Sequence, residues 1–123
     1  MVLTDYEKTQ IGTAIADEIK NNLLYVAFGT GNTAPTPGDT ALVAEVVRIA
    51  KAETTETADT VTVSGYLDTT AGNGNTIAEI GTFKESTAGT VRTRHVLETP
   101  IAKTSSKEYW VDISIKRTIT EEV

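Results

Sequence analysis

Short apolar or alternating runs separated by turn-forming sequence fill the chain from residue 23 onward, and this pattern constrains the fold more than any other feature. The runs that suit strands are LLYVAF (23–28), VVRIAKAE (46–53), VTVSGYL (61–67), TIAEIGTF (76–83), VRTRHVLE (91–98) and YWVDISIKRTI (109–119). The segments between them are rich in Gly, Asn, Thr, Ser and Pro, which favour turns. Frequent turns between short strands predict a mostly β fold: an antiparallel β-sandwich or open barrel of about six strands.

The final run gives the clearest strand pattern. Its two alternating sets are Tyr109, Val111, Ile113 and Ile115, and Trp110, Asp112, Ser114 and Lys116. Because successive side chains of a strand point to opposite faces, the first set is expected to be buried and the second to be wetter.

One helix is expected before the strands. Thr4 and Glu7 have the spacing of a capping box, in which a hydroxyl and a carboxylate satisfy free backbone N–H groups. Apolar residues then recur at intervals of three and four up to a stop at Asn21 and Asn22. Gly12 lowers helix propensity, which suggests close contact with a neighbouring backbone. We therefore predict a helix over about 4–22, packed on a β domain over about 23–120, within a single domain of residues 1–123.

Composition excludes several classes of function. The chain has 123 residues, a net charge of −6 and no cysteine. Its basic residues are scattered, so no patch is suited to nucleic acid or to an anionic membrane. The absence of cysteine removes disulfides and thiolate chemistry and is typical of folding in a reducing cytoplasm. Neither a signal-peptide pattern nor a run of about 18 apolar residues is present, so insertion into a membrane is not expected.

The sequence YVAFGTGNTAPTPGDTAL (25–42) resembles a phosphate cradle at first sight. Gly29 and Gly31 follow a strand, but the third glycine of a dinucleotide fingerprint is missing and no GK[ST] motif follows. Pro35 and Pro37 remove N–H donors where an anion would need them. We interpret the segment as a structured loop whose glycines supply positive φ angles.

This loop, residues 29–40, has two interpretations. It is either a rigid element that contacts a partner, in which the prolines reduce the entropy lost on docking, or a long ordered loop without such a role. Asp39 and Thr40 are predicted to cap a short helical turn through Leu42 to Val46.

No group of residues indicates catalysis, a cofactor or a metal. His95 is the only imidazole, is flanked by Arg92 and Arg94, and has no recognisable nucleophile to activate, so it is expected on a strand face. Asp59, Asp68 and Asp112 lack the spacing of a calcium loop. The GNGN segment (72–75) is predicted to be a hairpin turn in which Asn and Gly adopt left-handed conformations.

Two further features leave alternatives open. Glu45 and Arg48 form either a local ion pair or a pair between subunits. Trp110 either anchors an interface or lies beneath the N-terminal helix.

The order of motifs resembles a known family. It runs from a helix that begins with Leu-Thr, through a strand that ends in GTG, to TAPTPGDTAL and then Glu45 and Arg48. An I-x-E-x-G-x-F signature follows, carried by Ile77, Glu79, Gly81 and Phe83. This arrangement is similar to small structural domains of tailed bacterial and archaeal viruses, found in tail-fibre, baseplate and other appendage proteins.

The resemblance implies a non-enzymatic virion structural protein, made and folded in the host cytoplasm. Such a protein associates with copies of itself, for example as a trimer, and with other proteins of the tail or capsid. It acts as a fibre, adaptor or decoration subunit and needs no cofactor, nucleic acid or membrane. The alternative is a carbohydrate-binding β-sandwich module that recognises a receptor. Candidate interface residues are Gly29, Gly31, Pro35, Pro37, Asp39, Leu42, Glu45, Arg48 and Trp110.

Overall fold

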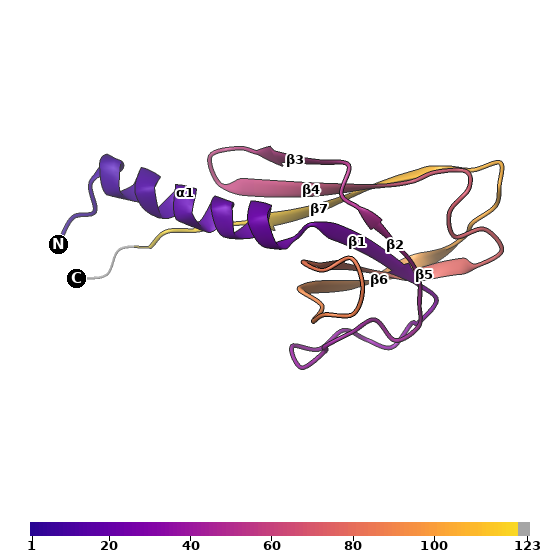
Figure 1. Cartoon of the computed structure of the whole chain (residues 1–123). Coiled ribbons are helices and arrows are strands. Elements are labelled where there is room, and N and C mark those ends of the chain that lie inside the picture. The colour runs from indigo at the N-terminus through magenta and orange to yellow at the C-terminus, as the bar shows by residue number, and fades with distance from the viewer. Residues whose placement is uncertain (121–123) are drawn as a thin grey trace.

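The computed structural model describes residues 1–120 and shows one helix followed by strands (Figure 1). The elements are α1 (Asp5–Asn22), β1 (Tyr25–Gly29), β2 (Glu45–Ala50), β3 (Glu53–Glu56), β4 (Thr60–Leu67), β5 (Thr76–Phe83), β6 (Thr93–Ala102) and β7 (Tyr109–Lys116).

The strands form two antiparallel sheets that face each other. One has the order β2-β1-β5-β6 and the other has the order β3-β4-β7. The fold is therefore a β-sandwich with an N-terminal helix and not a closed barrel, which confirms the predicted class. The described residues form seven strands, one more than the sequence predicted.

The additional strand arises because the expected run at 46–53 changes sheet. The Lys51 N–H donates to the carbonyl of Leu24, which precedes β1, whereas the Ala52 N–H donates to the carbonyl of Ser64 in β4. Consecutive residues thus bond to different sheets, and β3 forms from sequence that had been assigned to a turn. This crossing connects the two sheets on the side of the sandwich where β2 and β3 lie.

On the opposite side, β6 runs further than expected, to Ala102 and through Pro100. Its pairing with β5 shifts register between Ile77 and Glu79, so residues 97–100 fall outside a regular ladder. Such an irregularity accommodates a proline, which cannot donate a ladder hydrogen bond.

The main core lies between the sheets. Its fully buried members include Val26, Phe28, Val61, Val63, Leu67 and Ile77. Strand β7 alternates as predicted: its inward residues, such as Val111 and Ile113, are half-buried, and its outward residues are exposed.

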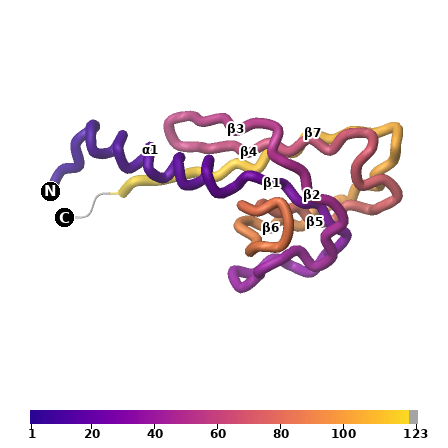
Figure 2. Tube along the Cα trace, in the orientation of Figure 1, coloured from indigo at the N-terminus to yellow at the C-terminus, as the bar shows by residue number. Residues whose placement is uncertain are grey.

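Helix α1 begins as predicted. The Thr4 side chain accepts a hydrogen bond from the Glu7 N–H, and Ala16, Ile19 and Leu23 join the main core. The first half of the helix extends beyond the sheets, beside the segment that follows β7 (Figures 1 and 2). A Cβ at Gly12 would meet the Arg117 side chain at 3.6 Å, so the predicted contact with a backbone is wrong.

The GNGN segment forms a turn between β4 and β5, but these strands lie in different sheets, so the predicted hairpin is wrong. Gly72 and Gly74 have φ angles of 71° and 82°, as predicted, but the two asparagines do not adopt positive φ. Lys103, which is almost fully buried, donates to the Asn73 side chain at 2.7 Å and holds this turn in place.

Candidate functional site

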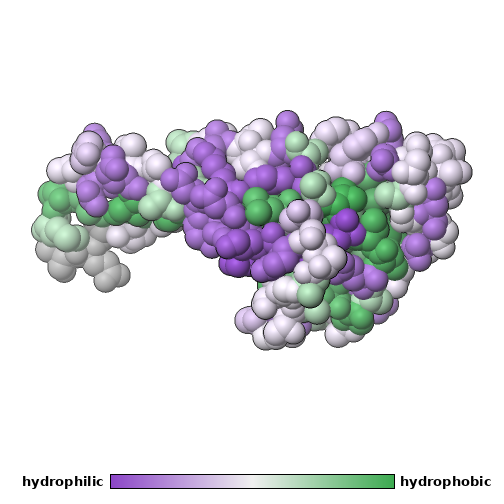
Figure 3. Space-filling view, viewed as in Figure 1, coloured by the Kyte–Doolittle hydropathy of each residue, from purple (hydrophilic) through white to green (hydrophobic). Residues whose placement is uncertain are grey.

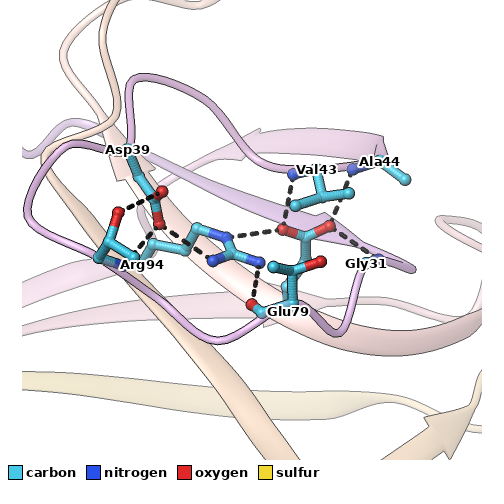
Figure 4. Close-up of polar contacts among 8 residues, drawn as sticks. Gly31, Asp39, Val43, Ala44, Glu79 and Arg94 are labelled. Carbon is cyan, nitrogen blue, oxygen red and sulfur yellow. Dashed lines mark hydrogen bonds and ion pairs between the residues drawn. The ribbon is translucent and has the colours of Figure 1, made fainter.

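A buried carboxylate organises the β1–β2 loop, which we define as residues 30–44. Glu79 lies on β5, and its side chain is completely inaccessible to solvent. Its oxygens accept hydrogen bonds from the backbone N–H groups of Gly31 at 2.7 Å, Val43 at 2.9 Å and Ala44 at 2.9 Å (Figure 4). One side chain thus joins the two ends of the loop.

Arg94 on β6 completes the network. Its Nε donates to Glu79 at 3.0 Å, and its two terminal nitrogens donate to Asp39 at 3.0 Å and to the Thr33 carbonyl at 2.8 Å. Only 3% of the Arg94 side chain is exposed. Asp39 in turn accepts from the N–H and the hydroxyl of Thr36. The middle of the loop is therefore attached to the same pair of strands as its ends (Figure 4).

The electrostatics of the network favour the charged forms. Burial by itself raises the pKa of Glu79, but the N–H groups of Ala44, Val43 and Gly31 together with Arg94 outweigh it and hold the pKa below its usual value. Hydrogen bonds from Thr36 and the charge of Arg94 likewise lower the pKa of Asp39. Glu79 and Arg94 are therefore an ion pair at neutral pH.

Stability is expected to fall in acid because Glu79 binds a proton more weakly in the folded chain than in the unfolded chain. Its contribution is complete above the unfolded pKa and is lost as the pH falls from about 5 through the lowered folded pKa. Urea unfolding between pH 7 and pH 3 should show this loss, and Glu79→Gln should have a flatter profile. Identical profiles for the two proteins would contradict the assignment. Asp39, Glu56 and Asp68 also have lowered pKa values, so some pH dependence should persist in the variant.

Gly29 and Gly31 make room for the carboxylate. A Cβ at Gly31 would lie 2.3 Å from a Glu79 oxygen and 2.5 Å from Cβ of Val43, and one at Gly29 would lie 2.6 Å from the Ala44 carbonyl oxygen. Neither glycine has a positive φ, so the interpretation of their role as conformational is wrong. They are needed because they lack a side chain.

The predicted helical turn after Asp39 is also wrong. Residues 41–44 are not helical and contain bends, and β2 begins at Glu45. Leu42 is 7% exposed and packs with Ala27, Phe83 and Val91 in a second apolar cluster. The predicted turn through Val46 cannot form because β2 already pairs with β1 from Glu45, which lies opposite Gly29.

Glu45 and Arg48 form the local ion pair that was one of the two alternatives. Two guanidinium nitrogens of Arg48 donate to the Glu45 carboxylate, at 3.0 and 2.7 Å. The guanidinium also lies 3.5 Å from the centre of the Phe83 ring and donates to the carbonyls of Glu85 and Ala88. Arg48 thus holds the loop between β5 and β6 against β2.

The network leaves a fixed surface with exposed apolar groups. Pro35 and Pro37 lie exposed on the β1–β2 loop, and Val43 and Val46 are 58% and 39% exposed. Apolar atoms gather over β2 and the end of this loop in the space-filling view (Figure 3). A groove of about 550 Å³ lies beside Val46, between β2 and the β5–β6 loop.

Trp110 is exposed and does not lie beneath α1. The residue is 61% exposed, and its ring stacks on Tyr66 of the neighbouring strand, with 4.8 Å between ring centres. The Tyr66 hydroxyl donates to Glu108, and this hydrogen bond is the main reason that the pKa of Tyr66 is raised. The two rings form a small aromatic surface on the outer face of the second sheet.

The remaining candidates lie apart from the network. His95 is exposed on β6, as predicted for a strand-face residue. Within residues 1–120, no group of three or more His, Cys, Asp or Glu side chains is arranged to hold a metal ion. In the same part of the chain, no helix has both the length and the apolarity to cross a bilayer.

The two central residues of the network, Glu79 and Arg94, were not among the candidates. Glu79 stood out only as part of the I-x-E-x-G-x-F signature, and Arg94 only as a neighbour of His95. A usable signal existed, because a charged residue within the otherwise apolar run TIAEIGTF must be paired if it is buried.

Comparison with known proteins finds no family model, no curated protein and no solved structure that matches this chain.

Proposed function

We propose that this chain is a non-enzymatic structural protein of a tailed virus, which associates with copies of itself and attaches to the tail, the baseplate or the capsid. It serves there as a fibre, adaptor or decoration subunit. The resemblance of its motifs to virion appendage domains is the basis for the viral assignment. The fixed β1–β2 loop is the structural observation that supports a role in contact.

Rigidity is what suits this loop to binding a protein surface. Its ends and its middle are bonded to the Glu79–Arg94 pair, so little conformational entropy remains to be lost on docking. Its exposed apolar side chains, Val43 and Val46, can then be buried against a neighbour.

The chemistry of the network also supports a structural role. Both carboxylate oxygens of Glu79 are occupied by hydrogen bonds within the chain, and the side chain is inaccessible. A general acid or base must instead reach its substrate directly or through one water molecule. The charges of this site are used to hold backbone in place.

Sedimentation of the purified chain and imaging of virions test the proposal together. We expect a discrete oligomer in solution, or ordered copies on the particle, or both. A chain that stays monomeric at high concentration and is missing from virions would contradict the proposal.

Changing Pro35 and Pro37 together to glycine should impair assembly more than folding. Both residues are exposed, so the free energy of unfolding should fall by no more than about 2 kcal/mol, whereas self-association should weaken about tenfold or more because the loop gains freedom. Urea unfolding and sedimentation measure the two effects.

Pro100→Gly is the matched control, since Pro100 is exposed but lies on β6. It should leave assembly unchanged. Equal losses of folding and assembly in the loop variant would show that the loop belongs only to the domain's own structure.

A carbohydrate-binding module is the second candidate, and the stacked pair of Tyr66 and Trp110 favours it. Exposed aromatic rings offer apolar faces on which a sugar ring can pack. Glycan binding that is measurable in the parent chain and lost in Trp110→Ala would support this function. Absence of binding to a broad set of glycans would contradict a carbohydrate-binding function.

A further inference from the structure

The free edge of β7 differs from the other three sheet edges. Strand β3 has four residues, β2 meets β1 with a register shift, and β6 contains Pro100 and an irregular segment. By contrast, β7 has eight residues in unbroken register with β4, without proline or bulge. Within residues 1–120 no strand pairs with its other side, and Figure 1 shows β4 between β3 and β7. A long, regular, unprotected edge is suited to pairing with another strand.

The hydrogen-bonding pattern shows which backbone groups are free. The Arg117 N–H donates to the Asp59 carbonyl, so Arg117 faces β4. Because the direction alternates along a strand, Tyr109, Val111, Ile113 and Ile115 also bond to β4. The N–H and C=O groups of Trp110, Asp112, Ser114 and Lys116 therefore point away from β4, toward the free edge.

An apolar groove follows this edge. It has a volume of about 420 Å³, and Ile80, Leu97, Val111 and Ile113 supply its apolar lining. The inward side chains of β7 remain half-exposed because the sandwich is open between β6 and β7. A partner strand beside β7 would cover both the unpaired backbone and these side chains.

We propose that the partner is β7 of a second copy, paired antiparallel about a two-fold axis at Ile113. This inference deepens the proposed self-association and rests on it. The four residues with free backbone groups then pair among themselves: Trp110 opposite Lys116, and Asp112 opposite Ser114.

The side chains of the edge are complementary in this register. Lys116 of one copy lies opposite the exposed ring of Trp110, which favours a cation–π contact. Asp112 lies opposite Ser114 and has two diagonal neighbours, the partner's Lys116 and the partner's Asp112, so two contacts between opposite charges flank one between like charges. If the register between the two β7 strands shifted by two residues, the two-fold axis would pass through Asp112, and the two Asp112 carboxylates would lie directly opposite each other. On the inward face, Ile113 lies opposite Ile113 of the second copy, and Val111 lies opposite Ile115 of the second copy. These apolar side chains close the groove.

The pairing would join two three-stranded sheets into one of six strands. The helix and the segment after β7 lie at one end of each molecule, so the two-fold axis places them at opposite ends of the dimer (Figure 2). An isologous contact of this kind leaves the β1–β2 loops free to join each dimer to further copies of the chain or to other proteins.

The first test is Ser114→Pro, which blocks the edge without removing a backbone hydrogen bond to β4. The N–H of Ser114 points outward, so the only backbone donor that proline removes is the intermolecular one, and its ring lies where the partner would be. The dissociation constant of the dimer should rise at least about 100-fold, because two symmetric hydrogen bonds are lost. Ser114→Ala is the matched control, since it also loses the hydroxyl contact with Thr62 but keeps the N–H.

The second test does not depend on tolerance of proline. The chain contains no cysteine, and residues at 113 would face each other across the axis as a non-hydrogen-bonded pair, close enough for a disulfide. Ile113→Cys should give a covalent dimer under mild oxidation, whereas Ile115→Cys should not, because its partner is Val111.

The outcomes separate this inference from the proposed function. Loss of the dimer in Ser114→Pro but not in Ser114→Ala, with crosslinking at 113, supports β7 pairing. An oligomer that survives Ser114→Pro, or equal crosslinking at 113 and 115, overturns the β7 inference and leaves self-association through another surface. A monomer that still joins virions also overturns only the β7 inference. A β7 dimer that never joins virions supports the inference and contradicts the viral role.

Discussion

Replacing Glu79 with glutamine is expected to lower the free energy of unfolding by about 3–5 kcal/mol, the range seen when one partner of a buried ion pair is removed. The substitution keeps the size of the side chain, so the loss does not come from a cavity. It leaves the Arg94 guanidinium buried without its main counter-charge. It also places an NH₂ donor at one of two positions that need an acceptor, facing either two backbone N–H groups or one backbone N–H group and Arg94. Urea unfolding at pH 7 measures the change.

Glu98→Gln is the control for this experiment. Glu98 is exposed on β6, so the same change of chemistry should alter stability by no more than about 0.5 kcal/mol. Similar small losses in both variants would show that the Glu79 network does not hold the fold together.

Gly31→Ala has the second largest expected effect. The new methyl group would overlap a Glu79 oxygen at 2.3 Å and Cβ of Val43 at 2.5 Å, and both are fixed by the network. We expect a loss of about 2–4 kcal/mol, which combines overpacking with hydrogen bonds that are broken to relieve it. Hydrogen exchange should show faster exchange at the N–H groups of Val43 and Ala44.

Gly38→Ala provides the comparison within the same loop. A Cβ there would meet its nearest neighbour at 3.9 Å, so the substitution should be neutral or slightly stabilising. If Gly31→Ala were equally well tolerated, the close approach of Glu79 to the loop would not exist in solution.

The helix start and the strands whose limits are set by neighbouring residues in the sequence were predicted correctly. Thr4 and Glu7 gave the start of α1 because a cap is decided within one turn. The alternation from Tyr109 to Lys116 gave β7 and its two faces because a strand has a fixed period of two. The TIAEIGTF run coincides with β5, since its flanking turns are marked by Gly and Asn or by Ser and Thr.

The features that depend on long-range pairing were missed or misread. Strand β3 consists of Glu and Thr and has no apolar alternation, so only its ladder with β4 makes it a strand. The Glu79–Arg94 pair depends on the register of β5 against β6, which no local pattern encodes. The positive φ angle predicted for Gly31 was wrong, and its contact with Glu79 could not be predicted because Glu79 lies 48 residues away in sequence.

Imaging of purified virions at a resolution that traces side chains tests the central claim most directly. The account predicts ordered copies of this chain on the tail or capsid, with Val43, Val46 and the prolines of the β1–β2 loop covered by a neighbouring protein. Particles that lack the chain, or that carry it with this loop entirely open to solvent, would contradict the account.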